Sequence, residues 1–598
     1  MWRESQRPAH RRLCRRLKWL SYASRLLRIP DLPTASEITV KETLDLLDGG
    51  FQPVAEAICN GGYAFWLGSG VSRDRVIGLD GVLAKLLEFL RVRAVADPAG
   101  PYATGLEAIL ALAALPEAAR RAIDLNRPVS EWIGLDALIN ALWRQYSAVL
   151  ATEIDGEPAD HLLWEGVDFT VTFAAQEPDL EHYAVAVLAL EGVVTEVATP
   201  NWDGLIEGAL AKLGWAKEAF RVTVTGEDLR EPSRAQATLY KFHGCALRAI
   251  NDEAAYRKLL VARQGQIVRW SATDDFRIVR EQLQALIQRQ RTLMVGLSAQ
   301  DANIQKLFAE VGAHEGWKWN DSPTPIVVAT ETLGLDQKAI LEAAYGDDYD
   351  ANRVEIAQAA RLRAYSKPLF AALVLKVIGE KLKVLASDIA APNLDEAARA
   401  ALGEGITHLR DLAANAGDAD RRGLMAATIG AVSRTRSQLS DGRSLAGALK
   451  YYPMDDQPVN RMKGKQALAA TGQREAAAAL GLIGLDARDT GLGISVGDVE
   501  DPRTAAVTLA AGASGIRVFL AANDDSIGDL LGDGAYDETD PDVIVICSRR
   551  VADEQQRSPS GQYRDGRSGP RYISLGPMLG EAEDLADLRD AFGKAIGL

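Results

Sequence analysis

Short apolar runs alternate with amphipathic stretches from about residue 40 onward, a pattern typical of strands and helices interleaved in an α/β fold. The apolar runs predict strands at 64–68, 193–199, 237–242, 292–296 and 325–330. Between them, helical spacing of apolar residues predicts helices at 81–92, 204–213, 276–290 and 301–312. We therefore expect an α/β unit in this part of the chain.

The stretch from 93 to 190 separates the first two predicted strands and is rich in Ala and Leu. A structureless loop of that length is rare inside a compact domain. We interpret it as a helical insertion that covers or completes a site.

The pattern of predicted secondary structure changes twice in the second half of the chain. A helix after Pro368 is expected to run to about residue 386, and the segment 388–393 is a candidate boundary before a mainly helical region. The α/β rhythm returns near the end, with predicted strands and helices at 493–496, 502–514 (helix), 516–521, 542–548, 571–575 and 581–596 (helix). The expected organisation is a basic arm (1–35), an α/β domain (36–388), a helical region (389–485) and a smaller C-terminal α/β domain (486–598).

Composition narrows the class of protein. The chain has 598 residues, 47% of them hydrophobic and 25% charged, which is ordinary for a globular protein and excludes extended disorder. Charges such as Glu191 and Glu196 interrupt the longest apolar runs, so no membrane-spanning segment is expected. The four cysteines form no Cys-x-x-Cys pair, which excludes the usual zinc knuckle and favours a reducing compartment; we expect a cytoplasmic protein.

Charge is distributed unevenly. The net charge of −15 argues against nucleic-acid binding by the whole protein surface. The first 30 residues, however, carry nine Lys or Arg and one acid, so they hold +8 and the remainder −23. This start fits an organelle presequence, a polyanion-binding arm or an extension without a folded role. Nucleic-acid contact is thus expected only indirectly or through local basic segments.

Two segments of the C-terminal region have unusual composition. Residues 523–542 are rich in Asp, which fits either a divalent-cation site or a solvated loop, and the loop is the commoner outcome. Residues 549–571 combine Ser and Gly with six arginines, the composition of a mobile loop that can touch a partner or a phosphate backbone.

Candidate chemistry gathers at the ends of the predicted strands. The first strand runs into Gly68-Ser69-Gly70-Val71-Ser72, and the next ones lead to Asn201-Trp202-Asp203, His243-Gly244 and Leu297-Ser298. In open α/β sheets, ligands bind just beyond the carboxyl ends of the strands. Each signal alone has a simpler explanation: a glycine turn, a helix cap at Asn201 or a core histidine at His243. Together they predict a ligand site, and the glycine turn fits a pyrophosphate.

Four ordered motifs resemble the nucleotide-binding motifs of the sirtuin family. They are GSGVS (68–72), TPNWD (199–203), FHG (242–244) and VGLSAQD (295–301), and the likeness covers roughly residues 55–335, in the N-terminal half of the chain. The resemblance implies a Rossmann-like domain that binds NAD+ as a substrate and cleaves its nicotinamide–ribose bond.

The resemblance also implies roles for individual residues. His243 is similar to the catalytic histidine of the family, and we assign Asn201 to orienting the attacking water. Gly68, Ser69, Gly70, Val71 and Ser72 resemble the loop around the pyrophosphate. The remaining residues that the resemblance places at the cofactor are Thr199, Asp203, Gly296, Ser298 and Asp301.

Two departures from the family pattern matter. The paired cysteines of the zinc module of sirtuin deacylases are missing, so no zinc is expected, and Arg73-Asp74-Arg75-Val76-Ile77 replaces the Gly-Ile-Pro-Asp-Phe-Arg segment. With the insertion and the extra C-terminal domain, the chain instead resembles bacterial sirtuin-like NAD+ hydrolases of anti-phage systems, which deplete NAD+ in abortive infection. That likeness implies a homo-oligomer and a protein partner such as a HerA-type ATPase or a short Argonaute.

Two other functions remain open from the sequence. One is a zinc-independent protein deacylase, which would use acyl-lysine in place of water and would need an open substrate channel. The other is a non-catalytic scaffold that senses NAD+ or ADP-ribose in a larger complex, although such a sensor has no need of both His243 and Asn201.

Overall fold

The computed structural model describes residues 34–174, 177–215, 219–230, 233–440, 450–495, 504–510, 515–551 and 569–597. Nearly all of the basic arm predicted at 1–35, and most of the Arg-rich segment 549–571, lie outside the described residues.

A seven-stranded parallel sheet forms the centre of the larger α/β unit, as predicted. Its strands follow the spatial order β3-β4-β2-β1-β5-β6-β7, with β1 between the two halves, which is a Rossmann-like arrangement. The strands are β1 (Tyr63–Leu67), β2 (Glu196–Thr199), β3 (Phe220–Thr223), β4 (Ala237–Lys241), β5 (Arg291–Val295), β6 (Ile326–Ala329) and β7 (Arg361–Leu362). All five strands predicted here are confirmed, and the sequence pattern missed β3 and β7.

Helices cover both faces of the sheet, and successive side chains of each strand point to opposite faces. The strands therefore contribute side chains to two cores. In β1, Tyr63, Phe65 and Leu67 enter one core, while Ala64 and Trp66 enter the other. The first face is covered by α2 (Val40–Asp48), α3 (Gln52–Cys59), α10 (Leu180–Leu190), α11 (Leu205–Lys212) and α20 (Ser366–Ser387). The opposite face is covered by α16 (Asp274–Arg289), α17 (Ala302–Glu315), α18 (Leu335–Tyr345) and α19 (Asp347–Ala360).

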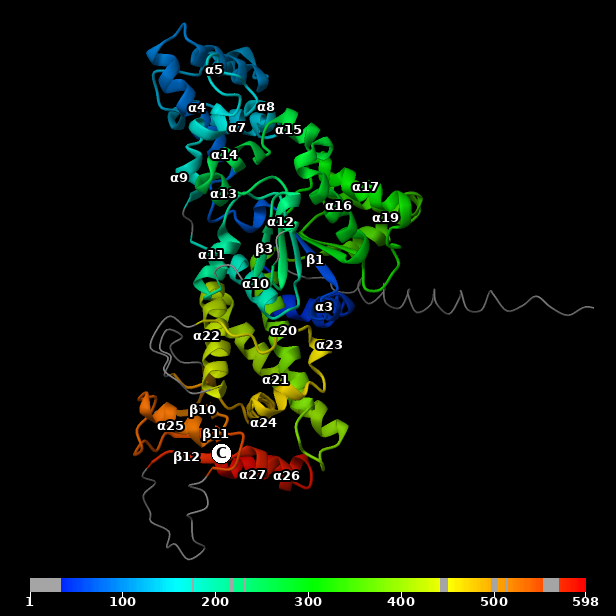
Figure 1. Ribbon diagram of the computed structural model, residues 1–598, viewed down its shortest axis with the longest axis vertical. Helices are drawn as coiled ribbons and strands as arrows, with labels where there is room; N and C mark the ends of the chain where they lie inside the picture. Colours follow the sequence, from blue (N-terminus) through cyan, green and yellow to red (C-terminus); the bar gives the residue numbers. More distant parts are fainter. Residues whose placement is uncertain are drawn as a thin grey trace, which may run out of the picture.

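A helical insertion follows β1 and lies at one end of the molecule, at the top of Figure 1. It is built from α4 (Leu79–Ala96), α5 (Pro101–Leu112), α6 (Glu117–Arg121), α7 (Leu135–Trp143), α8 (Tyr146–Val149) and α9 (Phe169–Ala174). All of these helices except α6 contribute buried side chains to a separate apolar core. By contrast α10, which falls within the stretch 93–190, is buried almost throughout and packs beneath the parallel sheet.

A smaller mixed sheet forms the opposite end of the molecule, beyond the helices α21 (Glu396–Gly417), α22 (Arg421–Ser440) and α24 (Gln473–Thr490) (Figure 1). Its order is β12-β11-β10-β9-β8, with β9 antiparallel to both neighbours. The strands are β8 (Ile494–Ser495), β9 (Val507–Leu509), β10 (Ile516–Ala521), β11 (Val543–Cys547) and β12 (Arg571–Ser574).

Two predictions for this region are wrong in detail. The helix expected at 502–514 is replaced, where the structure describes it, by β9, whose Val507 and Thr508 pair with β10. The acidic stretch 523–542 contains the helix α25 (Asp524–Gly532), which begins where Asn523 accepts the backbone N–H of Ser526. The closing helix predicted at 581–596 is confirmed as α27 (Leu585–Ile596), and a short helix that the sequence pattern missed, α26 (Leu575–Glu581), precedes it.

Candidate functional site

The predicted site residues follow β1, β2, β4 and β5, which are consecutive in the sheet order. Because these strands are parallel, their carboxyl ends lie at one edge of the sheet. The chain passes from β1 to β2 on one side of β1 and later returns to β5 on the other side. This reversal of strand order is the position where open α/β sheets bind ligands.

Two glycine turns pack against each other at this edge. The backbone N–H of Gly68 donates to the carbonyl of Val295 at 3.0 Å, and that of Gly70 donates to the carbonyl of Gly296 at 3.0 Å. Gly296 has a φ of +64°, and a Cβ placed there would lie 2.7 Å from the nitrogen of Val71. The glycines therefore allow the turns after β1 and β5 to approach closely, a need that exists with or without a ligand.

Asn201 is held by its amide and its backbone. Its Nδ2 donates to the carbonyl of Gly68 at 3.1 Å, and its backbone N–H donates to Oγ1 of the buried Thr199 at 3.0 Å. Since the amide nitrogen faces Gly68, the remaining Oδ1 is the acceptor that Asn201 can offer to a bound molecule.

His243 follows β4 and is 7% exposed. Its Nε2 lies 2.9 Å from Oδ2 of Asp301, although the two atoms are not aligned as a hydrogen bond. Burial raises the pKa of Asp301, but the contact with His243 and the backbone N–H of Asn303 lower it by a larger amount. The pKa of Asp301 is therefore below its usual value. An ionised carboxylate therefore faces the imidazole.

Trp202 links the two candidate catalytic residues. It follows Asn201 directly, and its Nε1 donates to the backbone carbonyl of His243 at 2.9 Å. The same carbonyl accepts the backbone N–H of Val261 at 2.9 Å. The strand ends of β2 and β4 are thus tied together beside the site.

Asp203 is buried and contacts protein groups. Its Oδ1 accepts the backbone N–H of Leu205 at 3.2 Å, and its carbonyl accepts a hydrogen bond from Lys241. The Lys241 ammonium also lies 2.6 Å from the carboxylate of Glu207, and neighbouring negative groups raise its pKa in spite of complete burial. Asp203 and Lys241 therefore belong to one polar network beneath the site.

The loop after β5 is supported by two glutamines. Gln337 donates to the carbonyl of Leu297 at 2.8 Å, and Gln305 donates to the carbonyl of Ala299 at 3.0 Å. Ala299 has a φ of +61°, a conformation that costs energy for a residue with a Cβ. Ser298, between the two braced residues, is exposed and open to a ligand.

The helical insertion contacts this edge of the sheet. The Trp202 ring lies 5.9 Å from Phe169 and 5.7 Å from Phe173 between centroids. Tyr146 of α8 is close enough to Asp301 for that charge to add to the effect of burial, which raises the pKa of Tyr146 to about 12. The insertion thus contributes side chains beside the site, as the sequence suggested.

Two functional candidates were not found from the sequence. His182 of α10 lies with its Nε2 3.2 Å from Oγ of Ser72, and Asp179 caps the same helix. Asp179 is the N-cap of α10 and His182 lies in its first turn, and the only sequence signal is an Asp-x-x-His spacing of the kind that caps helices.

Across the residues that the structure describes, no group of three or more His, Cys, Asp or Glu side chains is placed to hold a metal ion. In the same residues, no helix is long and apolar enough to cross a membrane.

Residues 195–347 match the family model of the SIR2-like domain. The match runs from β2 to the start of α19, so it lies in the middle of the chain. The sequence motifs had instead placed the likeness in the N-terminal half. The turn after β1 precedes the matched segment, yet β1 is hydrogen-bonded to β2 within the same sheet. No curated protein matches the chain. The protein therefore contains a sirtuin-like domain, and SIR2-like domains use NAD+.

Proposed function

We propose that the SIR2-like domain of this protein is an NAD+ glycohydrolase, which converts NAD+ and water to nicotinamide, ADP-ribose and a proton. The observation that carries the proposal is the convergence of Asn201 and His243 at the carboxyl ends of neighbouring strands, tied together through Trp202. The site that they form lies where the strand order of the sheet reverses.

The reaction needs little acid catalysis. When the bond between C1′ of the ribose and the pyridinium nitrogen breaks, its electron pair stays on nicotinamide, which leaves as a neutral molecule. The ribose then develops oxocarbenium character, as in glycoside hydrolysis, and nearby oxygen atoms stabilise it. In this proposal the Oδ1 of Asn201 accepts a hydrogen bond from the attacking water, whose oxygen bonds to C1′.

His243 supplies the base in this proposal. With Nε2 against the Asp301 carboxylate, Nδ1 is the nitrogen left to accept a proton from the water or from a ribose hydroxyl. The carboxylate stabilises the imidazolium that forms. Ser69, Ser72 and Ser298 are the hydroxyl side chains near the two glycine turns, and the resemblance assigns them to the NAD+ phosphates and ribose.

Water is favoured over a protein substrate as the acceptor because the helical insertion contacts the site. Trp202 packs on Phe169 and Phe173, and Tyr146 lies near Asp301. A deacylase would instead need a channel for an acyl-lysine chain.

The biological setting that we propose is the depletion of NAD+ during phage infection, with the protein acting as a cytoplasmic homo-oligomer beside a partner such as a HerA-type ATPase or a short Argonaute. The support is the combination of a SIR2-like domain with a helical insertion and a second α/β sheet. Phage challenge of cells that carry the gene, with NAD+ measured over time, tests it; unchanged NAD+ during infection would contradict it.

Product analysis tests the enzymatic proposal. Full-length protein, alone and with its genomic neighbour, is incubated with NAD+, and chromatography separates nicotinamide, ADP-ribose and cyclic products. We expect equal amounts of nicotinamide and ADP-ribose, loss of both with His243→Ala, and no loss with the matched control His408→Ala on α21. O-acyl-ADP-ribose from an acylated peptide would identify a deacylase, and NAD+ bound without cleavage would identify a sensor.

A further inference from the structure

The N-terminus of α10 connects to the glycine turn after β1 through His182. The Nδ1 of His182 accepts the backbone N–H of Asp179 at 3.1 Å, and the Nε2 of His182 lies 3.2 Å from Oγ of Ser72. Because Nδ1 is an acceptor here, the ring proton of the neutral imidazole sits on Nε2 and is donated to Ser72. Burial lowers the pKa of His182 despite the nearby charges of Asp203 and Asp179, so the ring is neutral at physiological pH.

This direction of the hydrogen bond excludes a serine nucleophile. In a catalytic triad the histidine accepts the serine proton, whereas here the histidine donates to the serine oxygen. The hydroxyl proton of Ser72 is consequently free to point to an acceptor on a bound molecule, such as a phosphate oxygen. His182 therefore fixes Ser72 as a donor toward the site.

Asp179, which places His182, is held by cations from three parts of the chain. Its carboxylate lies 3.5 Å from Nε of Arg75 just after the glycine turn, 3.2 Å from Nζ of Lys367 on α20, and 2.5 and 2.7 Å from Nε and Nη2 of Arg422 on α22. Burial opposes its ionisation, but hydrogen bonds from Arg422, the backbone of Leu180 and Lys367 hold the pKa of Asp179 far below its usual value. An isolated helix cap does not need such support.

The Arg422 contact extends this connection to the other end of the molecule. The helix α22 contacts α10, and it also packs against β10 of the smaller sheet and against the helix α25 beside that sheet. Figure 1 shows α22 between the parallel sheet and the smaller sheet. A change in the placement of α22 would thus act on Asp179 directly.

We propose that His182 is a positioning residue, which holds the Ser72 hydroxyl toward the ligand, and that Arg422 sets the place of His182 through Asp179. The proposal rests on the proposed function, since it concerns how the same site binds NAD+. It identifies α22 as the element through which the C-terminal region influences NAD+ binding.

The first test separates binding from chemistry. His182→Leu removes the donor to Ser72 and is expected to raise KM and the dissociation constant for NAD+ by about three- to tenfold, the range for one lost hydrogen bond, with kcat within about twofold. His182→Gln retains an N–H at the place of Nε2 and is expected to stay close to the wild type. A loss of kcat at unchanged KM, or equal defects in both variants, would overturn the proposal.

A double-mutant cycle tests whether His182 acts through Ser72. If it does, Ser72→Ala combined with His182→Leu binds NAD+ no more weakly than the more harmful single variant. Additive losses would show that the two residues act separately and would refute the positioning role.

Arg422→Gln tests the connection to α22, with Arg421→Gln as the matched control. Arg421 is the neighbouring arginine of the same helix and binds Asp418 and the carbonyl of Ile38 instead of Asp179. We expect a two- to threefold weaker NAD+ affinity for Arg422→Gln, because Lys367 and Arg75 still hold Asp179, and no change for Arg421→Gln. Equal affinities for both variants would refute the role of Arg422.

The outcomes distinguish this inference from the proposed function. A wild-type protein that binds but does not cleave NAD+ would refute the hydrolase, and the affinities of the variants would still decide the role of His182. A wild-type protein that cleaves NAD+ while all the variants bind it equally would refute the inference alone. Absence of NAD+ binding by the wild type, with its partner present, would refute both.

Discussion

Individual residues at the site are each oriented by one protein contact that leaves a second polar atom for a ligand. Asn201 gives its amide nitrogen to Gly68 and keeps its oxygen, and Ser72 accepts from His182 and keeps its proton. The sequence identified Asn201, Ser72 and His243 by their places after apolar strands. It could not identify the contact of His182 with Ser72 or that of His243 with Asp301, because these partners lie 110 and 58 positions apart in the chain and meet only through the fold.

Glu181 provides a prediction at the scale of a residue. It is buried beside Asp179; its Oε1 accepts the hydroxyl of Ser366 at 3.0 Å and its Oε2 has no hydrogen-bond partner. Burial raises the pKa of Glu181 to about 7. The folded state therefore binds more protons than the unfolded state between the unfolded pKa and about 7, so the stability from this group is lost as the pH rises through 7.

Glu181→Gln removes this penalty. We expect the variant to gain about 1–3 kcal/mol in unfolding free energy over the wild type at pH 8, and to gain little at pH 5. Urea unfolding followed by tryptophan fluorescence at both pH values measures the difference. The exposed Glu165→Gln is the control, and an equal effect at both pH values would contradict the burial of an ionisable Glu181.

At the scale of elements, the site depends on how the helical insertion docks on the sheet edge. The sequence predicted an insertion from its length and Ala- and Leu-rich composition, but the docking residues are spread over distant segments. The Trp202 ring contacts α9 through Phe169 and Phe173, and its indole nitrogen holds the carbonyl of His243. Trp202 thus serves the packing of the insertion and the placement of the imidazole at once.

Two substitutions of Trp202 separate these contributions. Trp202→Phe keeps an aromatic ring and loses one hydrogen bond, so we expect about 1 kcal/mol of lost stability and a severalfold lower rate of NAD+ cleavage. Trp202→Ala also loses the ring packing and is expected to cost about 2–3 kcal/mol. Trp317→Phe, which loses an indole bond to Ile287 away from the site, should lose similar stability and keep full activity. Full activity of Trp202→Phe would contradict the link to His243.

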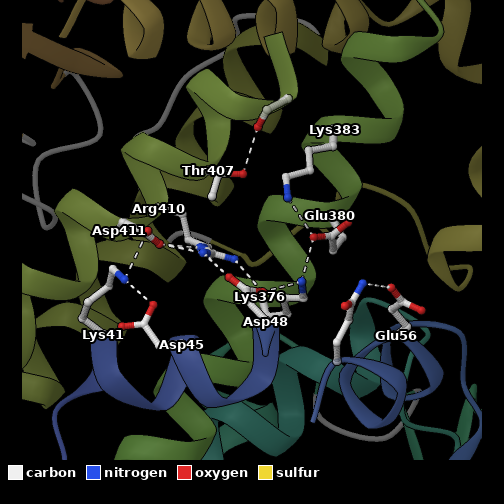
Figure 2. Close-up of polar contacts among 12 residues, drawn as sticks. Lys41, Asp45, Asp48, Glu56, Lys376, Glu380, Lys383, Thr407, Arg410 and Asp411 are labelled. Atoms are coloured by element: carbon white, nitrogen blue, oxygen red, sulfur yellow. Dashed lines mark hydrogen bonds and ion pairs between the residues drawn. The ribbon is translucent and has the colours of Figure 1, made fainter. Parts of the chain in front are cut away.

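At the scale of the whole molecule, partly buried ion pairs at Asp48 connect the parallel sheet unit to α21 of the helical region. The Asp48 carboxylate at the end of α2 lies 2.7 Å from Nζ of Lys376 on α20 and 2.6 Å from Nη2 of Arg410 on α21. Figure 2 shows Asp48 between these two side chains. Partial burial works against ionisation, yet these two cations hold the pKa of Asp48 below its usual value. The stability that Asp48 contributes is therefore present at neutral pH and is lost as the pH falls below the unfolded pKa of 3.8.

Asp48→Asn is expected to lower the unfolding free energy by about 2–3 kcal/mol at pH 7, because it leaves two buried cations with fewer partners. The deficit should shrink as the pH falls toward 3. Asp45→Asn is the matched control on the same helix: its carboxylate is 60% exposed, so its pair with Lys41 should contribute about 0.5 kcal/mol or less. Equal effects of the two substitutions in denaturant unfolding would argue against a structural role for the Asp48 pair.

The parts of the fold that the sequence predicted are those with strong local patterns. β1, β5 and β6 are apolar along most of their length because both of their faces are buried. β3 was missed because its two central residues are only half-buried, and β7 has two residues. The stretch around β9 was predicted as a helix because its strand character depends on pairing with β10.

The most direct test of the central claim is the rate of nicotinamide release from NAD+ by the wild type and by Asn201→Ala, with Asn126→Ala in the insertion as the control. Because Asn201 acts on the attacking water in this account, its loss should lower kcat by about 100-fold or more while NAD+ affinity changes by no more than about threefold. Release by the wild type and by Asn126→Ala at equal rates, with the signal lost in Asn201→Ala, is the predicted result. Release by Asn201→Ala at the wild-type rate would contradict the proposed mechanism.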